Sequence, residues 1–480
     1  MTALPVVFAG CSTTSDAGLK EIQQTINSRT GQTVEWPPTF ADNDKTEQVL
    51  ARLLAQDLTA DAAVQIALLN NRSLRATLEE VSISRADLLQ AALIHNPEFF
   101  ASFRFPDRPP SAANLEYSLT ADFLDLLLLP LRKRVAALQF EQTKLRVSHQ
   151  ILQLASEAKA AFYTVQARQR LLNRLQAIVE VNEAGVDLSL RQHKVGNITD
   201  LELANQSAAF QQAKLEWGKT QAQLRADRER LNRLLGLWGK NTPWKVGDEL
   251  PLIPENEIEL ANLESLAITQ RLDLAAARQQ LALAYRALSL GNKTRYLPAS
   301  IKLGVDTERE TDRQRVTGPT LAFEVPIFDR GQAAIPRLQS QYRRAQWQTE
   351  ALATDIRSEV RQARDAMTAA RDLTDFYAKI YLPQRIRIVN ETLLQYNAMQ
   401  KGTLDLITAK ERELSAEREY TEAWRDYWIA RAELEKAVGG RLGVQQPATG
   451  SSHTLAPSDG ERAGVRGSHQ TNDQPEHQQK

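Results

Sequence analysis

Residues 115–123 read LEYSLTADF, a segment whose side chains alternate between apolar and polar. Leu115, Tyr117 and Leu119 stand at every second position, and polar residues stand between them. Because successive side chains of a strand point to opposite faces, this period of two predicts a strand with one apolar and one polar face. Three further segments show the same alternation, which predicts two pairs of strands. These segments are 99–105, 301–306 and 319–325, and the apolar positions of all four strands are Phe99, Phe103, Phe105, Leu115, Tyr117, Leu119, Ile301, Leu303, Val305, Leu321 and Phe323.

Two kinds of sheet fit this pattern. The apolar face could contact lipid in a membrane β-barrel whose other face lines a water-filled lumen, or it could cover a soluble core. No window of about 18 uninterrupted apolar residues offers a transmembrane helix. The most apolar run, residues 123–131, contains Asp125 and Pro130. If the chain enters a membrane, it does so with strands. The pattern of the helices, described next, favours the membrane β-barrel over the soluble sheet.

The segments after the strand pairs are long and helical in pattern. Residues 332–400 number about 70, which would extend roughly 100 Å as one helix. Leu382, Ile386 and Val389 begin an apolar seam whose spacings alternate between four and three. Such a narrow seam is typical of helices laid side by side. Pro383 is expected to kink this helix or to unwind it locally.

The chain is internally duplicated. Leu74 and Leu274 stand in matching contexts, and Gly196 in VGNITDLEL matches Gly402 in KGTLDLI. Landmarks in the same order predict two copies of one unit, each with a helix, a strand pair and a long helical hairpin. The expected divisions are a signal-peptide remnant with a lipobox at 1–11, an extended N-terminal segment at 12–57, a first repeat at 58–240, a linker at 241–257, a second repeat at 258–440 and a disordered tail at 441–480.

Four strands per chain are too few to form a closed barrel. The outer strands would leave backbone groups unpaired, which hydrocarbon does not tolerate. Two chains would give eight strands, whose interior side chains fill, whereas three chains would give twelve and leave a passage. The expected fold class is therefore mainly α with membrane β. It combines a long α-helical barrel with a transmembrane β-barrel of four strands per chain, closed by trimerisation.

Four motifs carry a resemblance to a known family: ALLNNRSL at 67–74, VGNITDLELANQ at 195–206, EVPIFDRGQ at 324–332 and KGTLDLITAKER at 401–412. With the two-copy plan, they make the chain similar to the TolC-type outer-membrane efflux proteins (outer membrane factors), in their lipoprotein branch. The resemblance implies a homotrimer in the outer membrane of a Gram-negative bacterium, extending into the periplasm. It also implies a passive efflux duct that docks to a periplasmic adaptor protein and an inner-membrane pump, with no cofactor.

The N-terminus carries a second resemblance. Phe8-Ala9-Gly10-Cys11 follows a short apolar stretch and resembles the bacterial lipobox, in which signal-peptide cleavage exposes an acylated cysteine. By this resemblance Cys11 is lipidated, and Ser12 directs the lipoprotein to the outer membrane. The alternative is an incidental buried cysteine.

The two helical hairpin turns are the expected functional ends. Gly196 and Gly402 can adopt the positive φ of a tight reversal, and Thr199 and Thr403 can cap the returning helices. By the family resemblance, the adaptor-docking tips are Val195, Gly196 and Thr199 in the first turn, and Gly402 and Thr403 in the second.

An acidic residue follows each turn. Asp200 and Asp405 complement the positive start of the returning helices. By the family resemblance, they form a gate, where three copies of each would make a ring of negative charge that favours cations. Arg191, Lys194 and Lys401 are candidate partners for these carboxylates.

Other classes of function find no support. The 59 basic and 59 acidic residues cancel, which leaves no basic excess for nucleic acid. No HExxH, P-loop, GxSxG or CxxC motif appears, so no enzyme and no metal site is predicted. The remaining alternative to the duct is a soluble periplasmic coiled-coil protein with a small β cap.

Overall fold

The structure of the protein is a computed structural model that describes residues 17–33, 36, 43–108, 112–247, 250–254, 262–296, 298, 300–325 and 327–442. The predicted lipobox with Cys11 and the predicted tail from residue 443 onward lie outside the described residues.

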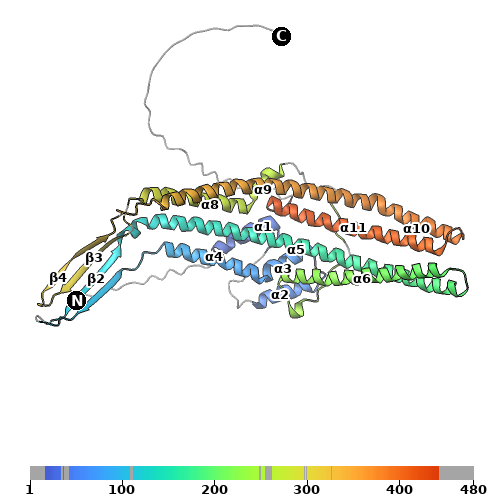
Figure 1. Ribbon diagram of the computed structural model, residues 1–480, viewed down its shortest axis with the longest axis horizontal. Coiled ribbons are helices and arrows are strands. Elements are labelled where there is room, and N and C mark those ends of the chain that lie inside the picture. Colours follow the sequence, from blue (N-terminus) through green and yellow to red (C-terminus); the bar gives the residue numbers. More distant parts are fainter. Residues whose placement is uncertain are drawn as a thin grey trace, which may run out of the picture. The chain divides into compact units, whose positions relative to one another are not determined.

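The four predicted strands form one antiparallel sheet in the order β1-β2-β3-β4 (Figure 1). β2 pairs with β1 of its own repeat and with β3 of the other. β4 begins four residues before the expected start, because Arg315 and Thr317 occupy positions where the alternation calls for apolar side chains. Phe105 lies one residue beyond β1. The strands are β1 (Glu98–Arg104), β2 (Asn114–Asp122), β3 (Ile301–Arg309) and β4 (Arg315–Phe323).

Polar capping residues start the helices of the first repeat. The Thr59 hydroxyl accepts a hydrogen bond from the backbone N–H of Ala62 (3.2 Å), and the Asn71 side chain accepts one from Leu74 (3.0 Å). Such caps satisfy N–H groups that the start of a helix leaves free. The helices are α3 (Ala60–Asn70), α4 (Arg72–Ala91), α5 (Phe123–Lys194) and α6 (Asp200–Leu235).

The second repeat has the same element order, but its long outgoing helix is interrupted. A π-helical turn spans Tyr377–Tyr381, just before Pro383. Pro383 has no N–H to donate to the carbonyl of Lys379, and its ring crowds that carbonyl. The predicted local unwinding at Pro383 is confirmed. The helices are α7 (Leu263–Gln270), α8 (Leu272–Thr294), α9 (Ala334–Phe376), α10 (Leu382–Asn397) and α11 (Thr403–Val438).

The N-terminal segment contains two helices, α1 (Ala17–Thr30) and α2 (Asn43–Leu54), so the expectation of an extended segment at 12–57 was wrong. Ile22 and Ile26 stand one helical turn apart and are both fully buried, and α1 packs against α4 and α5. Burial of this short apolar stripe explains the helix, because packing stabilises helices that are too short to form alone.

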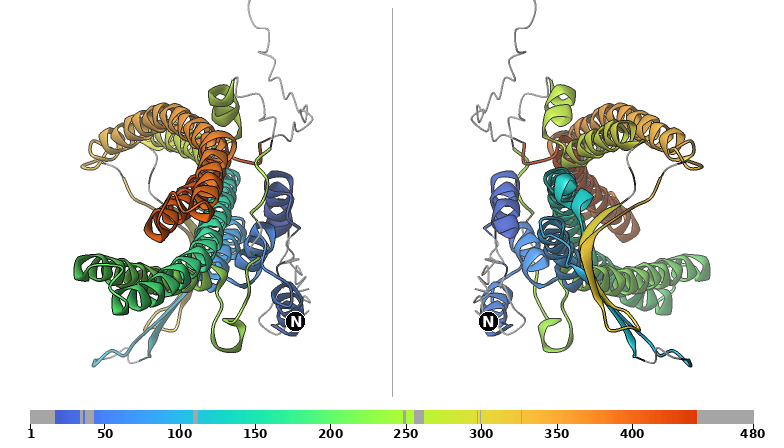
Figure 2. Two further views of the ribbon diagram at one scale, coloured as in Figure 1. Left: turned by 90° about the vertical axis from the view of Figure 1, so that its right-hand side faces the viewer. Right: turned by 90° about the vertical axis from the view of Figure 1, so that its left-hand side faces the viewer.

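Helix α5 joins the two repeats. It lies beside α4 and α6 of the first repeat and beside α8 and α11 of the second (Figure 2). Tyr163 of α5 stacks on Trp428 of α11 and meets Trp424 edge-on, with ring centroids 5.3 and 5.9 Å apart. The Trp424 indole N–H donates to the carbonyl of Pro251, which ties the linker to this cluster. None of the described helices has the length and hydrophobicity needed to cross a bilayer.

Candidate functional site

The strand register gathers the predicted apolar positions on one face of the sheet. Phe99 lies opposite Leu119, and Leu119 lies opposite Val305. These three side chains are more than half exposed, as are Phe103 and Leu321 on the same face. An exposed apolar surface shared by four strands is unusual on the outside of a protein in water.

The opposite face of the sheet is polar, and several of its side chains pair with one another. Arg104 donates to Glu116 (3.0 Å), and Lys302 donates to Glu98 (2.6 Å). The amide of Asn114 donates to Glu308 (2.6 Å). Several charged groups on this face therefore find partners on other strands: Arg104 with Glu116 on the adjacent strand, and Lys302 with Glu98 across β2.

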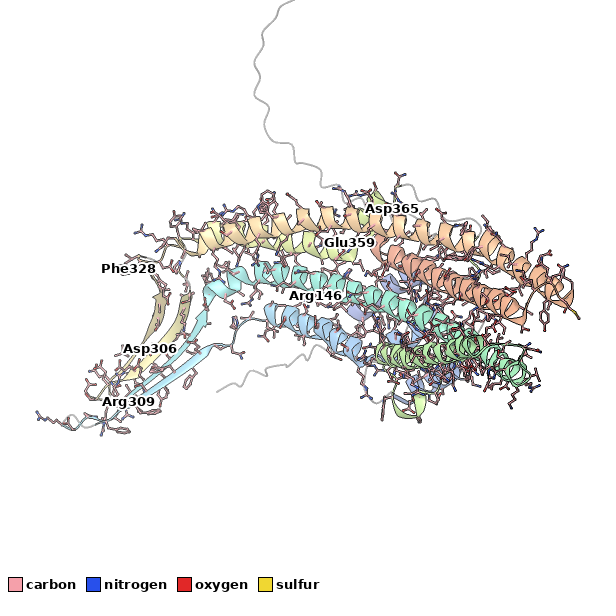
Figure 3. The ribbon with its side chains drawn as sticks, turned by 45° about the vertical axis from the view of Figure 1, so that its right-hand side comes forward. Arg146, Asp306, Arg309, Phe328, Glu359 and Asp365 are labelled. Atoms are coloured by element: carbon pink, nitrogen blue, oxygen red, sulfur yellow. The ribbon has the colours of Figure 1, made fainter. Side chains whose placement is uncertain are left out.

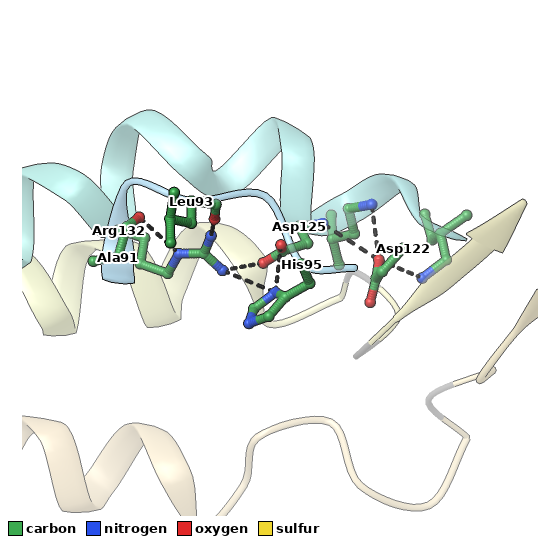
Figure 4. A network of polar contacts seen from close by, with 8 residues as sticks. Ala91, Leu93, His95, Asp122, Asp125 and Arg132 are labelled. Atoms are coloured by element: carbon green, nitrogen blue, oxygen red, sulfur yellow. Dashed lines mark hydrogen bonds and ion pairs between the residues drawn. The ribbon is translucent and has the colours of Figure 1, made fainter. Parts of the chain in front are cut away.

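A polar network ties the end of α4 to the start of α5, next to the sheet (Figure 4). Arg132 donates to the backbone carbonyls of Ala91 and Leu93, where α4 ends, and forms an ion pair with Asp125 near the start of α5. His95 also contacts Asp125. Burial would raise the pKa of Asp125, but the hydrogen bond with His95 and the charge of Arg132 outweigh it, so that pKa lies below its usual value.

The first hairpin turn has the geometry that its sequence predicted. Gly196 has a φ of +77°. The Thr199 hydroxyl accepts from the backbone N–H of Glu202 (3.2 Å), and the Glu202 carboxylate accepts from the backbone N–H of Thr199 (2.8 Å). This reciprocal capping box fixes the start of α6. The hydrogen bond from the Thr199 backbone lowers the pKa of Glu202.

We expect Thr199→Ala to destabilise the start of α6 by about 1 kcal/mol, because one capping hydrogen bond is lost. The pKa of Glu202 is lower in the folded protein than in the unfolded chain. The stability that the Glu202 carboxylate contributes is therefore fully present above its unfolded pKa, and it is lost as the pH falls through its folded pKa. Faster amide exchange of residues 200–203 at neutral pH would be the readout. Thr199→Ser, which keeps the hydroxyl, is the matched control, and equal exchange in both variants would contradict the prediction.

The second hairpin turn differs from expectation. Gly402 has a φ of −84°, and Met399 takes the positive φ (+58°) instead. Thr403 is the first residue of α11 and not its cap, whereas the Asp405 carboxylate accepts from the backbone N–H of Gly402 (3.1 Å). The chain reverses three residues earlier than predicted, so the positive φ expected at Gly402 and the cap expected at Thr403 were wrong.

The two predicted gate aspartates have different surroundings. The Asp200 side chain is almost fully exposed, and its Oδ1 lies 2.7 Å from Nε2 of His193. Within the described residues, no ion pair joins Arg191, Lys194 or Lys401 to either aspartate, and His193 is the partner of Asp200 alone. Sequence reasoning missed His193 because the path of the turn, and not residue spacing, brings it to Asp200.

Exposed apolar side chains stand at both turns. Val195 and Leu201 are 71% and 69% exposed at the first turn, and Met399 and Leu404 are 94% and 55% exposed at the second. Only Val195 was predicted to belong to a tip. Leu201 and Leu404 occupy the same place in their helices, two residues after the N-caps Thr199 and Gly402, whereas no sequence signal marks Met399. Among the described residues no three His, Cys, Asp or Glu side chains converge on a metal-sized site.

Comparison with known proteins finds relatives that match most of the chain. The chain is similar to the cobalt-zinc-cadmium resistance protein CzcC of Cupriavidus metallidurans, with 20% identity over 402 residues that cover 82% of this chain and 92% of CzcC. It resembles the CmeC outer membrane channel of Campylobacter jejuni, with a TM-score of 0.69 and 16% identity over 86% of this chain and 90% of that chain. It also resembles CusC, whose crystal structures concern transmembrane channel formation, with a TM-score of 0.67 and 18% identity over 80% and 92% of the two chains. No protein-family model matches the chain.

Proposed function

We propose that this chain, which has the fold of the TolC-type outer-membrane efflux channels, is the passive outer-membrane duct of an efflux system. The apolar face of the sheet carries this proposal. Its exposed side chains come from all four strands. The β1–β2 and β3–β4 connections lie at one end of the sheet, and the helices attach at the other end. In a bilayer this face would contact lipid, and the polar face would line the passage.

Closure by three chains follows from the edges of the sheet. Within the described residues β1 and β4 each pair with a single neighbouring strand, which leaves one edge of each free. Free strand edges are not tolerated in hydrocarbon, so the sheet needs further copies. Three copies would give twelve strands and a passage, whereas two would give a filled interior.

The hairpin tips are the proposed contact with a periplasmic adaptor protein, and through it with an inner-membrane pump. Val195, Leu201, Met399 and Leu404 present apolar side chains where the α5–α6 and α10–α11 hairpins end. Exposed apolar groups among polar turn residues such as Thr199 and Lys401 suit a protein–protein contact with a polar rim. The proposed lipid anchor rests on the Cys11 motif alone, and the mass of the mature N-terminal peptide tests it.

The function is tested by extraction and conductance. The duct should stay in the membrane fraction after high salt, require detergent for release, and conduct ions in planar bilayers. Release by salt alone would favour the soluble coiled-coil alternative. Because CzcC is named for resistance to cobalt, zinc and cadmium, these cations are the first cargo to test, by their accumulation in cells that lack the chain.

The gate proposal predicts a change in ion selectivity. Replacing Asp200 and Asp405 together with Asn should lower the preference for cations over anions, because it would remove six negative charges from the trimer entrance. The reversal potential in a salt gradient measures this preference. Asp365→Asn, an exposed position on α9, is the control. An unchanged reversal potential in the double variant would return both residues to helix capping alone.

A further inference from the structure

The apolar face of the sheet becomes basic at the end where β3 connects to β4. Arg309 of β3 lies directly opposite Arg315 of β4, and Leu115 lies on the other side of Arg309. These residues share a face with Leu303 and Val305, because they follow at even spacing along β3. Arg313 stands in the connecting turn with a φ of +71°. Figure 3 labels Arg309 at the end of β3 that is remote from the helices.

This pair of arginines lacks the local neutralisation seen on the polar face. Like charges directly opposite each other destabilise an antiparallel pair. No ion pair between Arg309, Arg313 or Arg315 and a carboxylate is present within the described part of the chain. Glu308 points to the opposite face and accepts from Asn114, and Asp312 accepts from the backbone N–H of Gln314 (2.8 Å). The arginine row therefore calls for an anion from outside the chain.

The height of the row along the strand identifies where that anion lies. Arg309 follows Ile301 by eight residues, which corresponds to about 26 Å along the strand. With the tilt of about 40° that barrel strands adopt, the rise is roughly 20 Å, close to the apolar band of about 25 Å. If the helices lie in the periplasm, the arginines reach the headgroups of the outer leaflet.

We propose that Arg309 and Arg315, aided by Arg313, bind the phosphate groups of outer-leaflet lipid headgroups. Guanidinium groups bind phosphate through paired, charge-assisted hydrogen bonds. Arginine is therefore better suited than lysine to binding a lipid phosphate. Their aliphatic stems continue the apolar face below the charged ends. This inference rests on the proposed function, because it places the sheet in the outer membrane.

Binding to the detergent-solubilised trimer tests the inference. The probes are lipid A with two phosphates, the same lipid without phosphates, and inorganic phosphate. Arg309→Gln/Arg315→Gln should weaken the affinity for phosphorylated lipid A at least about tenfold, because two charge-assisted contacts are lost. It should leave the weak binding of the phosphate-free lipid unchanged. Arg343→Gln/Arg344→Gln, on the exposed surface of α9, is the matched control. Arg309→Lys/Arg315→Lys should give an intermediate affinity, and it serves as the test if the Gln variant fails to fold.

Each outcome decides a separate point. Equal affinity of the Gln variant and the control for phosphorylated lipid A would overturn the inference, as would arginine-dependent binding of inorganic phosphate without binding of the lipid. Conductance in planar bilayers is measured on the same preparations. A wild-type protein that never enters bilayers overturns the proposed function, whereas a conducting Gln variant with undiminished lipid A affinity overturns this inference alone.

Discussion

Replacing Leu119 or Leu303 with arginine should destabilise the membrane-inserted protein by about 2–4 kcal/mol, because an arginine near the bilayer midplane loses its hydration. Leu119 pairs with Phe99 and Val305, halfway along the apolar face. The measurement is urea-induced unfolding in lipid vesicles. Since the face is proposed to contact lipid, this result would also test the proposed orientation of the sheet.

Ser118→Arg is the matched control, because Ser118 lies next to Leu119 in sequence but on the polar face opposite Asp306. Gly304 is unsuitable as a control, although the alternation places it on the polar face. A Cβ atom added there would lie 2.4 Å from the carbonyl oxygen of Leu119. Equal destabilisation by Leu119→Arg and Ser118→Arg would show that the two faces are wrongly assigned.

Replacing Trp424 with alanine should lower the free energy of unfolding by about 3–5 kcal/mol. The Trp424 side chain is 1% exposed and contacts Tyr163 edge-on. The substitution leaves a cavity between α5 and α11, and it also removes the hydrogen bond to the carbonyl of Pro251. Denaturant titration of the detergent-solubilised protein, followed by circular dichroism, gives the value.

Two further variants separate the effect of losing the buried ring from the effect of losing the hydrogen bond. Trp347→Ala removes an indole of the same size from an exposed position on α9 and should have an effect below about 0.5 kcal/mol. Trp424→Phe keeps most of the buried volume but loses the indole N–H, so it isolates the hydrogen bond to Pro251. A loss below about 1 kcal/mol in Trp424→Ala would mean that this cluster does not hold the repeats together.

The sheet and the duplicated plan could be predicted from the sequence because their signals are local and periodic. The alternation in residues 115–123 fixes which side chains share a face, and pairing of the strands preserves that assignment. The predicted resemblance to TolC-type outer-membrane efflux proteins is confirmed at the level of the fold.

The hairpin ends were only partly predictable. Gly196 adopts a positive φ as expected, whereas at the second turn that conformation falls on Met399, a residue that rarely adopts it. Glycine permits a positive φ without requiring it, so Gly402 was a misleading signal. The contact between His193 and Asp200 depends on the path of the turn between them, which residue spacing does not give. The roles of both tips and of the gate remain predictions.

The π-helical turn at Tyr377–Tyr381 sets the angular phase of α10 relative to α9. The buried residues Ile356, Val360, Met367 and Thr374 follow a seven-residue period that would continue to Tyr381 and Ile388. The apolar seam of α10 runs one residue later, through Leu382, Ile386, Val389 and Leu393. One residue corresponds to about 100° around an α-helix, and a π turn holds about one residue more than an α turn. The wide turn thus accommodates about the one residue by which the two seams differ in register.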